Sequence, residues 1–233
     1  MSQVTARQIT AAKIAGRQIT GTQIGASAGG ATPVNNAFVS EWSTTVVDET
    51  ITIPTQNIGT FNAVVDWGDS SPPETITAYN GFSHTYATAG DHTISITGTF
   101  PNIYINNNAA IKLKIKKVLN LGTVGWTKLE RAFKGCSNLT EFTAGSTNTS
   151  AVDSLNGTFQ NCTSLASLNV SSFDTSLVTD MYALLYGAAL TSLDVSSFNT
   201  SNVTDMQYMF GACSALTSIV GVEDWDITGL NST

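Results

Sequence analysis

Positive charge is missing from the C-terminal half of this chain. All ten lysine and arginine residues lie at positions 7–17 or 112–134, whereas nine acidic residues follow position 134. An acidic surface of this kind repels the phosphates of DNA and RNA. We therefore expect no nucleic acid among the partners of this protein.

Long apolar stretches are also missing. No run approaches the ~18 consecutive apolar residues that a membrane-spanning helix requires, so we expect no membrane insertion. The first residues contain no apolar core of about seven or more residues, so they do not read as a secretory signal. If the protein is displayed on a surface, it needs a route other than ordinary secretion.

Cysteine is scarce, which limits both disulfides and metal chemistry. Cys136, Cys162 and Cys213 occupy one aligned repeat position that alanine fills in another copy, and this pattern favours small buried residues. Reduced core thiols are the preferred interpretation, and a disulfide between Cys136 and Cys162 is the alternative. Three thiols without a histidine cluster make a poor zinc site.

Catalytic and metal-binding patterns do not stand out either. Asp66 and Asp69 are too few to supply the about six to eight oxygens that calcium takes, so we interpret them as turn residues. His84, one of only two histidines, is interpreted as a packing and hydrogen-bonding residue rather than a catalytic base. We expect no enzymatic activity, no cofactor and no bound metal.

What the chain does contain is a repeat. Phe133, Phe159, Leu185 and Phe210 mark four copies at steps of 26, 26 and 25, and the third copy is one residue shorter between Leu185 and Leu190. A fixed period in the twenties is typical of a leucine-rich-type solenoid, in which each turn covers the apolar edge of the one before. We predict short parallel strands around the Leu-x-x-Leu-x-Val segments and a helical turn around each Met-x-x-Met-Phe segment. The four marker residues and the three cysteines form the predicted repeat core.

One repeat copy carries a family resemblance. The segment 193–206, which reads LDVSSFNTSNVTDM and is followed by Met209-Phe210, resembles the BspA-type leucine-rich repeat of bacterial surface proteins. The resemblance covers roughly residues 118–233. It implies surface display and adhesion, and it implies no enzymatic activity. The sequence ends inside a further copy, so we expect either a degenerate cap or a natural protein that continues past Thr233.

Polar residues also recur within the repeat. Asp180 and Asp205 share one position, and Asp174 and Asn199 share another, so stacked turns would align them as polar ladders on one face. These four residues are the candidate ligand-facing positions. The competing interpretation, which we prefer, is that Asp180 and Asp205 cap the helical turns that follow them.

Residues 38–105 read as a separate β-rich module. The segments 65–71, VDWGDSS, and 84–94, HTYATAGDHTI, resemble the PKD-type immunoglobulin-like β-sandwich. Ser70 stands where that family usually has a second glycine, so the turn can differ at this point. The resemblance implies an extracellular spacer module.

The N-terminal residues 1–25 carry one bulky apolar residue every five positions. A period of five fits neither a free helix nor a flat strand, and one copy alone cannot bury these residues. We predict a segment that anchors and trimerises the protein; the alternative is a flexible tail that orders on a partner surface. The segment resembles short repeats of bacteriophage fibre proteins, and residues 26–37 follow it as a linker. The predicted contact residues are Val4, Ile9, Ile14, Ile19 and Ile24.

Together these patterns predict a mainly β protein with three parts: an N-terminal oligomerising shaft, a PKD/Ig-like β-sandwich over 38–105, and a BspA-type leucine-rich-repeat solenoid over 106–233. Display modules without a secretory signal fit a virion protein that assembles in the host cytoplasm. We expect a homotrimeric fibre or a capsid or tail decoration protein. Its partners would be other virion proteins at the N-terminus and a host-surface glycan or protein at the repeats. The alternative is a bacterial cell-surface adhesin of the BspA type.

Overall fold

The fold is built from β-strands and turns. The computed structural model describes residues 36–230, and these contain eleven strands and no helix, hence none that could cross a membrane. The prediction of a mainly β protein is confirmed. The strands are β1 (Phe38–Thr44), β2 (Glu49–Thr52), β3 (Asn62–Asp66), β4 (Glu74–Ile76), β5 (Ser83–Tyr86), β6 (Gly90–Thr99), β7 (Ile115–Asn120), β8 (Glu141–Thr143), β9 (Ser167–Asn169), β10 (Ser192–Asp194) and β11 (Ser218–Val220).

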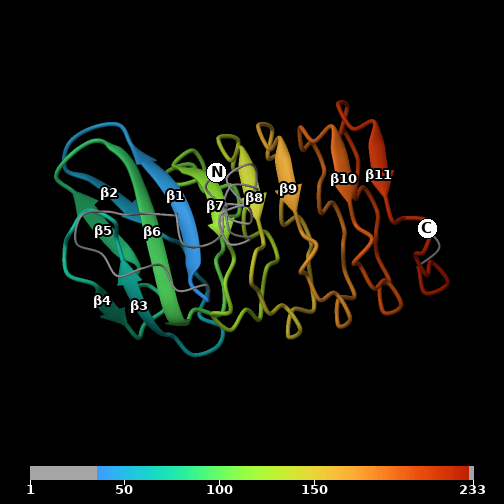
Figure 1. Cartoon of the computed structure of the whole chain (residues 1–233), viewed down its shortest axis with the longest axis horizontal. Helices are drawn as coiled ribbons and strands as arrows, with labels where there is room; N and C mark the ends of the chain where they lie inside the picture. Colours follow the sequence, from blue (N-terminus) through green and yellow to red (C-terminus); the bar gives the residue numbers. More distant parts are fainter. Residues whose placement is uncertain (1–35, 231–233) are drawn as a thin grey trace, which may run out of the picture.

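One seven-stranded sheet runs through most of the molecule (Figure 1). Its order is β4-β3-β6-β1-β7-β8-β9; β1 is antiparallel to β6 and β7, while β7, β8 and β9 are parallel. Trp42 of β1 lies opposite Ile115 of β7, and Val118 of β7 lies opposite Phe142 of β8. The predicted boundary between residues 105 and 106 therefore does not separate two sheets, because strands from both sides of it pair within one.

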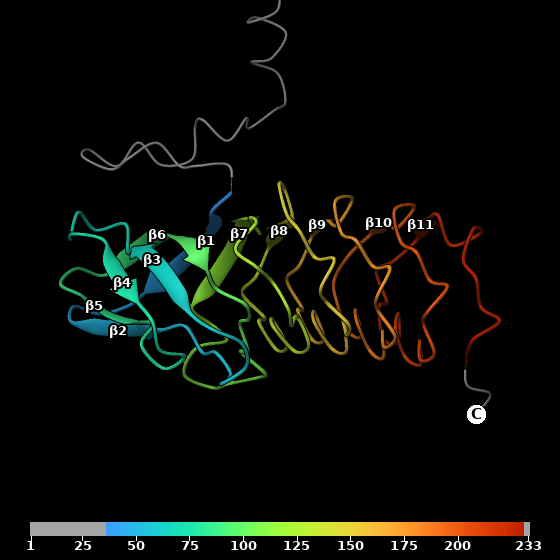
Figure 2. The ribbon, with the colours of Figure 1, turned by 90° about the horizontal axis from the view of Figure 1, so that it is seen from below.

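A second layer covers the antiparallel part of this sheet. β2 and β5 pair with each other and lie on one side of β1, β3 and β6 (Figure 2). The ring of Tyr86 stacks on His92 of β6 with centroids 3.6 Å apart, and its hydroxyl donates to the carbonyl of Trp67 at 2.8 Å. Ile94 and Ile96 are fully buried, whereas their neighbours along β6 are not, as the two-residue period of a strand requires. The core lies between the two layers.

The N-terminal predictions fall largely outside the described residues. The shaft over residues 1–25 lies outside them, as does the linker up to residue 35. Ala37 is described and fully buried, and its carbonyl accepts a hydrogen bond of 2.7 Å from the Asn120 side chain. The carbonyl of Asn36 accepts the N–H of Thr123 at 2.9 Å. These two residues belong to the folded part, so the predicted linker extends too far at this end.

The rest of the chain forms a stack of turns, each carrying one short strand (Figure 1). β7, β8 and β9 continue the large sheet, and β10 and β11 form a separate parallel pair. Outside the strands, a second row of backbone hydrogen bonds joins successive turns. The N–H groups of Leu155, Gly157 and Phe159, for example, donate to the carbonyls of Asp180, Tyr182 and Leu184. Two backbone ladders therefore hold the stack together.

The predicted helical turns are absent, and the reason lies in the backbone. Two positions of the repeat are left-handed in every one of the four copies. They are Arg131, Gly157, Ala183 and Tyr208 in one row, and Gly135, Asn161, Gly187 and Ala212 in the other. Alternate N–H groups then bond to the neighbouring turn, while those between them close β-turns. An α-helix would direct all of these groups along its own chain, so the helix prediction is wrong.

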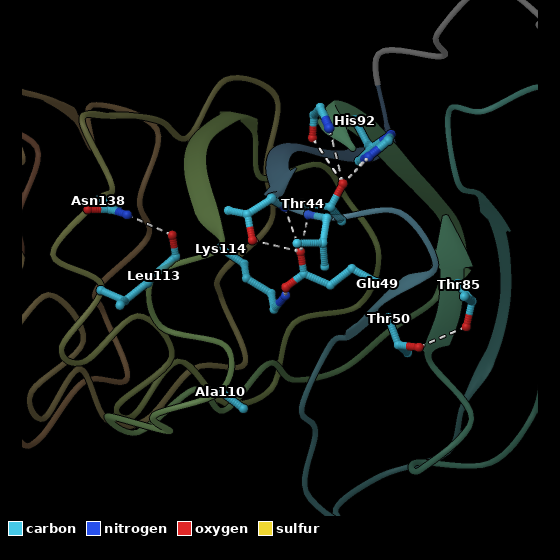
Figure 3. A network of polar contacts seen from close by, with 12 residues as sticks. Thr44, Glu49, Thr50, Thr85, His92, Ala110, Leu113, Lys114 and Asn138 are labelled. Carbon is cyan, nitrogen blue, oxygen red and sulfur yellow. Dashed lines mark hydrogen bonds and ion pairs between the residues drawn. The ribbon is translucent and has the colours of Figure 1, made fainter. Parts of the chain in front are cut away.

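Polar contacts join the antiparallel layers to the repeats beside β1 and β7 (Figure 3). The carbonyl of Lys114 accepts the N–H of Ser43 at 2.7 Å, and the Lys114 ammonium pairs with the Glu49 carboxylate. Asn138, in the first repeat copy, donates from its side chain to the carbonyl of Leu113 at 2.8 Å. With the continuous sheet, these contacts tie the two parts into one unit.

Candidate functional site

The predicted repeat core occupies the interior of the stack. Phe133, Phe159 and Leu185 are fully buried, and Phe210 in the fourth copy is half-buried. The rings of Phe133 and Phe159 stack with centroids 5.8 Å apart, so apolar contact continues from one turn to the next. Burying each such side chain stabilises the stack by roughly 1.5–3 kcal/mol.

The three cysteines are free thiols that pack between turns. Cys136 and Cys162 are fully buried, and Cys213 is half-buried. The thiol of Cys162 donates to the carbonyl of Phe133 at 3.2 Å, and the thiol of Cys213 donates to the carbonyl of Leu185 at 3.0 Å. Burial raises the pKa of both Cys136 and Cys162, which keeps these thiols protonated and unreactive. The structure contains no Cys136–Cys162 disulfide.

The row of Asp174 and Asn199 lies on the surface, but its side chains are already engaged. Oδ1 of each accepts the backbone N–H two residues on at 3.0 Å, from Ser176 and Ser201. Hydrogen bonds from Ser176 lower the pKa of Asp174. The same arrangement recurs at Asn148 and Asp226. The side chains of this row therefore close the turns in which they lie.

Asp180 and Asp205 share a repeat position, but the second carboxylate oxygen of each has different surroundings. In both, Oδ1 accepts the N–H two residues on at 2.8 Å, from Tyr182 and Gln207. This is the hydrogen bond that a capping residue makes, although a β-turn follows instead of a helix. The second oxygen of Asp180 accepts the Asn156 side-chain amide at 2.9 Å. The second oxygen of Asp205 has no partner among residues 36–230.

Two tyrosines distinguish the third and fourth copies from the earlier ones, Tyr182 in the third and Tyr208 in the fourth. Tyr182 stands at the repeat position that Asn156 occupies one turn earlier. Asn156 donates its side-chain amide to Asp180, whereas Asp205 has no equivalent amide to accept. The rings of Tyr182 and Tyr208 lie edge to face, with centroids 5.7 Å apart. Tyr208 is 60% exposed and has a φ of 57°. A left-handed backbone costs an ordinary residue about 1–2 kcal/mol, and so exposed a ring recovers little of this by burial.

A pocket of about 230 Å³ opens in the same turn, lined by Thr204, Asp205, Met206, Gln207 and Leu230. The Thr204 hydroxyl donates to the carbonyl of Thr179 at 3.1 Å, so it is engaged. The Gln207 side-chain amide has no partner within the described chain. The pocket therefore offers one carboxylate oxygen and one amide to a bound molecule.

A groove of about 300 Å³ marks a break in the parallel ladder. β9 and β10 belong to successive turns but are not hydrogen-bonded to each other, and residues of β9, β10 and β11 line the groove. The N–H of Thr217 donates to the carbonyl of Thr191, and that of Val195 to the carbonyl of Val220, both at 2.9 Å. The equivalent N–H groups of Thr191 and Val170 have no such acceptor in the part of the chain that is described. The break falls at the copy that is one residue short.

Sequence reasoning missed a row of buried threonines. Thr149, Thr175 and Thr200 recur at the repeat spacing and are almost fully buried. Their hydroxyls donate to carbonyls in the next turn, those of Asp174, Asn199 and Asp226. The signal was available, because each threonine stands between Asn or Asp and Ser at a fixed place in the period.

The acidic turn after β3 uses its carboxylates internally. Oδ1 of Asp66 accepts a backbone N–H of its own turn at 2.9 Å, and Asp69 pairs with His84 at 2.7 Å. Burial alone would raise the pKa of Asp69, but hydrogen bonds from Ser71 and His84 outweigh it and hold the pKa at about 2. Ser70 has a φ of 70°, so the turn stays left-handed without the glycine. Within residues 36–230 there is no group of three or more side chains suited to a metal ion.

This architecture defines a class of protein, a mainly β chain in which acidic stacked turns extend an antiparallel sheet. Residues 127–233 match the family described as "Mycoplasma protein of unknown function, DUF285". The match is consistent with a BspA-type surface protein. No curated protein and no solved structure matches the chain significantly.

Proposed function

We propose that this chain is an adhesive structural protein of a bacteriophage virion, a fibre or a capsid or tail decoration protein, whose repeats bind the host surface. The observation that carries this proposal is the sheet that continues from β4 to β9. Because the antiparallel part and the first repeats share this sheet, an attachment at the N-terminal side would hold the repeats in a fixed orientation. Such a unit acts by binding, without catalysis and without a cofactor.

The proposal includes the identity of the two parts. We take the antiparallel layers as a PKD/Ig-like β-sandwich and the stacked turns as a BspA-type leucine-rich-repeat solenoid. The Tyr86 hydroxyl on the Trp67 carbonyl and the left-handed Ser70 support the first, because both lie in the segments that resemble the PKD pattern. The regular row of hydrogen bonds between turns supports the second.

The N-terminal segment completes the proposed attachment protein. Val4, Ile9, Ile14, Ile19 and Ile24 would form the contact between three chains and the anchor to other virion proteins. Three copies on one anchor would let weak surface sites act together, because the later binding events become intramolecular. Strong binding by a single repeat face is then not required.

A second candidate is a bacterial cell-surface adhesin of the BspA type. The family match over residues 127–233 favours it, because this match is consistent with a surface protein of that kind. Both candidates use the repeats for adhesion. They differ in the particle that carries the protein.

Localisation of the full chain separates the two candidates. Antibodies raised against the protein should label purified virions from lysed cultures and should leave washed, uninfected cells unlabelled. Label confined to intact bacterial cells would support the adhesin instead. In parallel, changing Ile14 and Ile19 to Asp should turn trimers into monomers by light scattering. A trimer that survives both changes would contradict the proposed shaft.

A further inference from the structure

We propose that Tyr182 of the third copy, together with Asp205 and Tyr208 of the fourth, forms a binding site for an uncharged sugar. This inference rests on the proposed adhesive function and names the ligand class for it. Three observations support it: an aromatic pair whose Tyr208 ring is exposed, an Asp205 carboxylate oxygen without a partner among residues 36–230, and a pocket lined by Asp205 and Gln207.

The conformation of Tyr208 is the first observation. Its left-handed backbone position is held by Arg131, Gly157 and Ala183 in the other copies, so the fold does not need an aromatic ring there. The ring is 60% exposed and touches Tyr182 edge to face, which leaves much of its surface open to a ligand. A large, exposed and strained side chain at one copy of a repeat points to a role outside folding.

The second observation is the change from Asn156 to Tyr182 at one repeat position. In the earlier turn the Asn156 amide occupies the outer oxygen of Asp180 at 2.9 Å. In the later turn Tyr182, at the equivalent position, donates no such bond, and the outer oxygen of Asp205 has no partner among residues 36–230. One substitution in the repeat therefore supplies both an aromatic surface and a free hydrogen-bond acceptor.

The pocket shows what kind of molecule fits. Asp205 can accept hydroxyl hydrogens, and the free Gln207 amide can donate and accept, which suits the alternating donors and acceptors of a sugar ring. A tyrosine face suits the apolar C–H side of the same ring. Sialylated or sulfated sugars are disfavoured because the chain has no lysine or arginine after residue 134 to pair with an anion.

Tyr208→Gly gives the sharpest test, because folding and binding should move in opposite directions. The change gives the fourth copy a glycine at this repeat position, where the second copy already has Gly157. Removing the left-handed strain should raise the melting temperature of the full chain by about 1–4 °C. Binding to an array of neutral hexose, deoxyhexose and N-acetylhexosamine oligosaccharides should fall by about tenfold or more.

Asp205→Asn tests the carboxylate separately. The amide oxygen keeps the hydrogen bond to Gln207 N–H, so the melting temperature should stay within about 2 °C, whereas sugar binding should weaken by about tenfold. Asp194→Asn is the matched control, since it removes one exposed acid from the same stack and Asn169 stands naturally at the equivalent strand position. This control should bind like the unchanged protein.

The outcomes separate this inference from the proposed function. If the unchanged protein adheres to bacterial cells and both site variants adhere equally well, the site is wrong and the adhesive function stands. The array should also carry sialylated and sulfated sugars. If the unchanged protein binds these charged sugars and none of the neutral ones, the ligand class is wrong. If the protein adheres to no cells while binding neutral sugars through Tyr208 and Asp205, the site stands and host attachment fails.

Discussion

The hydroxyl of Thr175 holds both backbone groups of Asn199 in the next turn. It donates to the Asn199 carbonyl at 2.9 Å and accepts the Asn199 N–H at 2.8 Å. Thr149 makes the same two bonds to Asp174 one turn earlier. A buried side chain thus continues the inter-turn hydrogen bonding where no strand is present, and it fixes the spacing of the surface residues that follow.

Replacing Thr175 with Val should destabilise the stack without changing its shape. The two side chains have similar volume, but valine leaves the Asn199 N–H and carbonyl unpaired in a part-buried place, which costs about 1–3 kcal/mol. Urea unfolding should show this loss as a lower midpoint at unchanged slope. Ser172→Ala, at an exposed position of the same turn, should change stability by less than about 0.5 kcal/mol. Equal effects would mean that the threonine row is not structural.

The aromatic core should be the most sensitive part of the repeats. Phe159 is fully buried, with the Phe142 ring 4.8 Å and the Phe133 ring 5.8 Å from its own. Phe159→Ala should therefore cost about 3–5 kcal/mol, because it leaves a cavity between turns. Thermal or urea unfolding checks this, with Ser197→Ala on the exposed surface as the control. A comparable loss at Ser197 would show that the repeat has been interpreted inside out.

Apolar spacing made the period of the repeat and its core residues predictable. Phe133 and Phe159 are large apolar residues at a constant step, and burial is the only stable arrangement for such a row. The backbone of the same segment could not be predicted in this way. Arg131 and Tyr208 adopt left-handed conformations that their side chains do not favour. Hydrogen bonds to the adjacent turn hold Arg131 itself, and they hold Gln207 and Met209 on either side of Tyr208.

The continuous sheet was also beyond the reach of local patterns. β1 and β7 pair although more than seventy residues separate Trp42 from Ile115. Neither segment has a local sequence feature that identifies the strand with which it pairs. The polar candidates were found by their period, but their roles depend on single neighbours. Asp180 and Asp205 look equivalent in sequence and differ only because Asn156 stands beside one and Tyr182 replaces it beside the other.

The Glu49–Lys114 pair should make the free energy of unfolding depend on pH. The hydrogen bond from Lys114 and those from the Thr45 and Val46 N–H groups lower the Glu49 pKa from 4.5 to about 2. A lowered pKa in the folded state means that the carboxylate stabilises the fold above pH 4.5, and that this contribution is lost as the pH falls from 4.5 toward 2. We expect a contribution of about 1–2 kcal/mol, reduced from the full shift by solvent screening.

Lys114→Met is the variant that checks this pair. The loss of stability should be largest near neutral pH, and the difference from the unchanged protein should shrink as the pH falls toward 2. Unfolding midpoints in urea at several pH values give the comparison. Lys117→Met is the control, because its ammonium lies 3.4 Å from Glu41 in a more exposed pair. A pH-independent loss at Lys114 would indicate packing rather than charge.

Replacing Ser70 with glycine should stabilise the protein. Its φ of 70° costs a serine about 1–2 kcal/mol, whereas glycine adopts this conformation freely at a smaller entropic cost. Ser70→Gly should therefore raise the free energy of unfolding by about 0.5–1 kcal/mol. Ser71→Gly is the matched control: it should destabilise, because the Ser71 hydroxyl donates to Asp69 at 2.6 Å. Calorimetry on both variants measures the opposite signs, and a loss at Ser70 would mean that its side chain has an unseen role.

The break between β9 and β10 should close when the missing residue is restored. Inserting one serine between Ala189 and Leu190 returns the third copy to the length of the first two. The N–H groups of Thr191 and Val170 should then find acceptors across the gap, and their hydrogen exchange should slow by about fivefold, since a backbone hydrogen bond contributes about 1 kcal/mol. In the unchanged protein these two amides should exchange faster than those of Thr217 and Val195, which are bonded to the adjacent turn. Ala189→Ser is the control, because it adds the same side chain without the length. If the insertion leaves both exchange rates unchanged, the short copy is not the cause of the break, and the groove must be set by the side chains that line it.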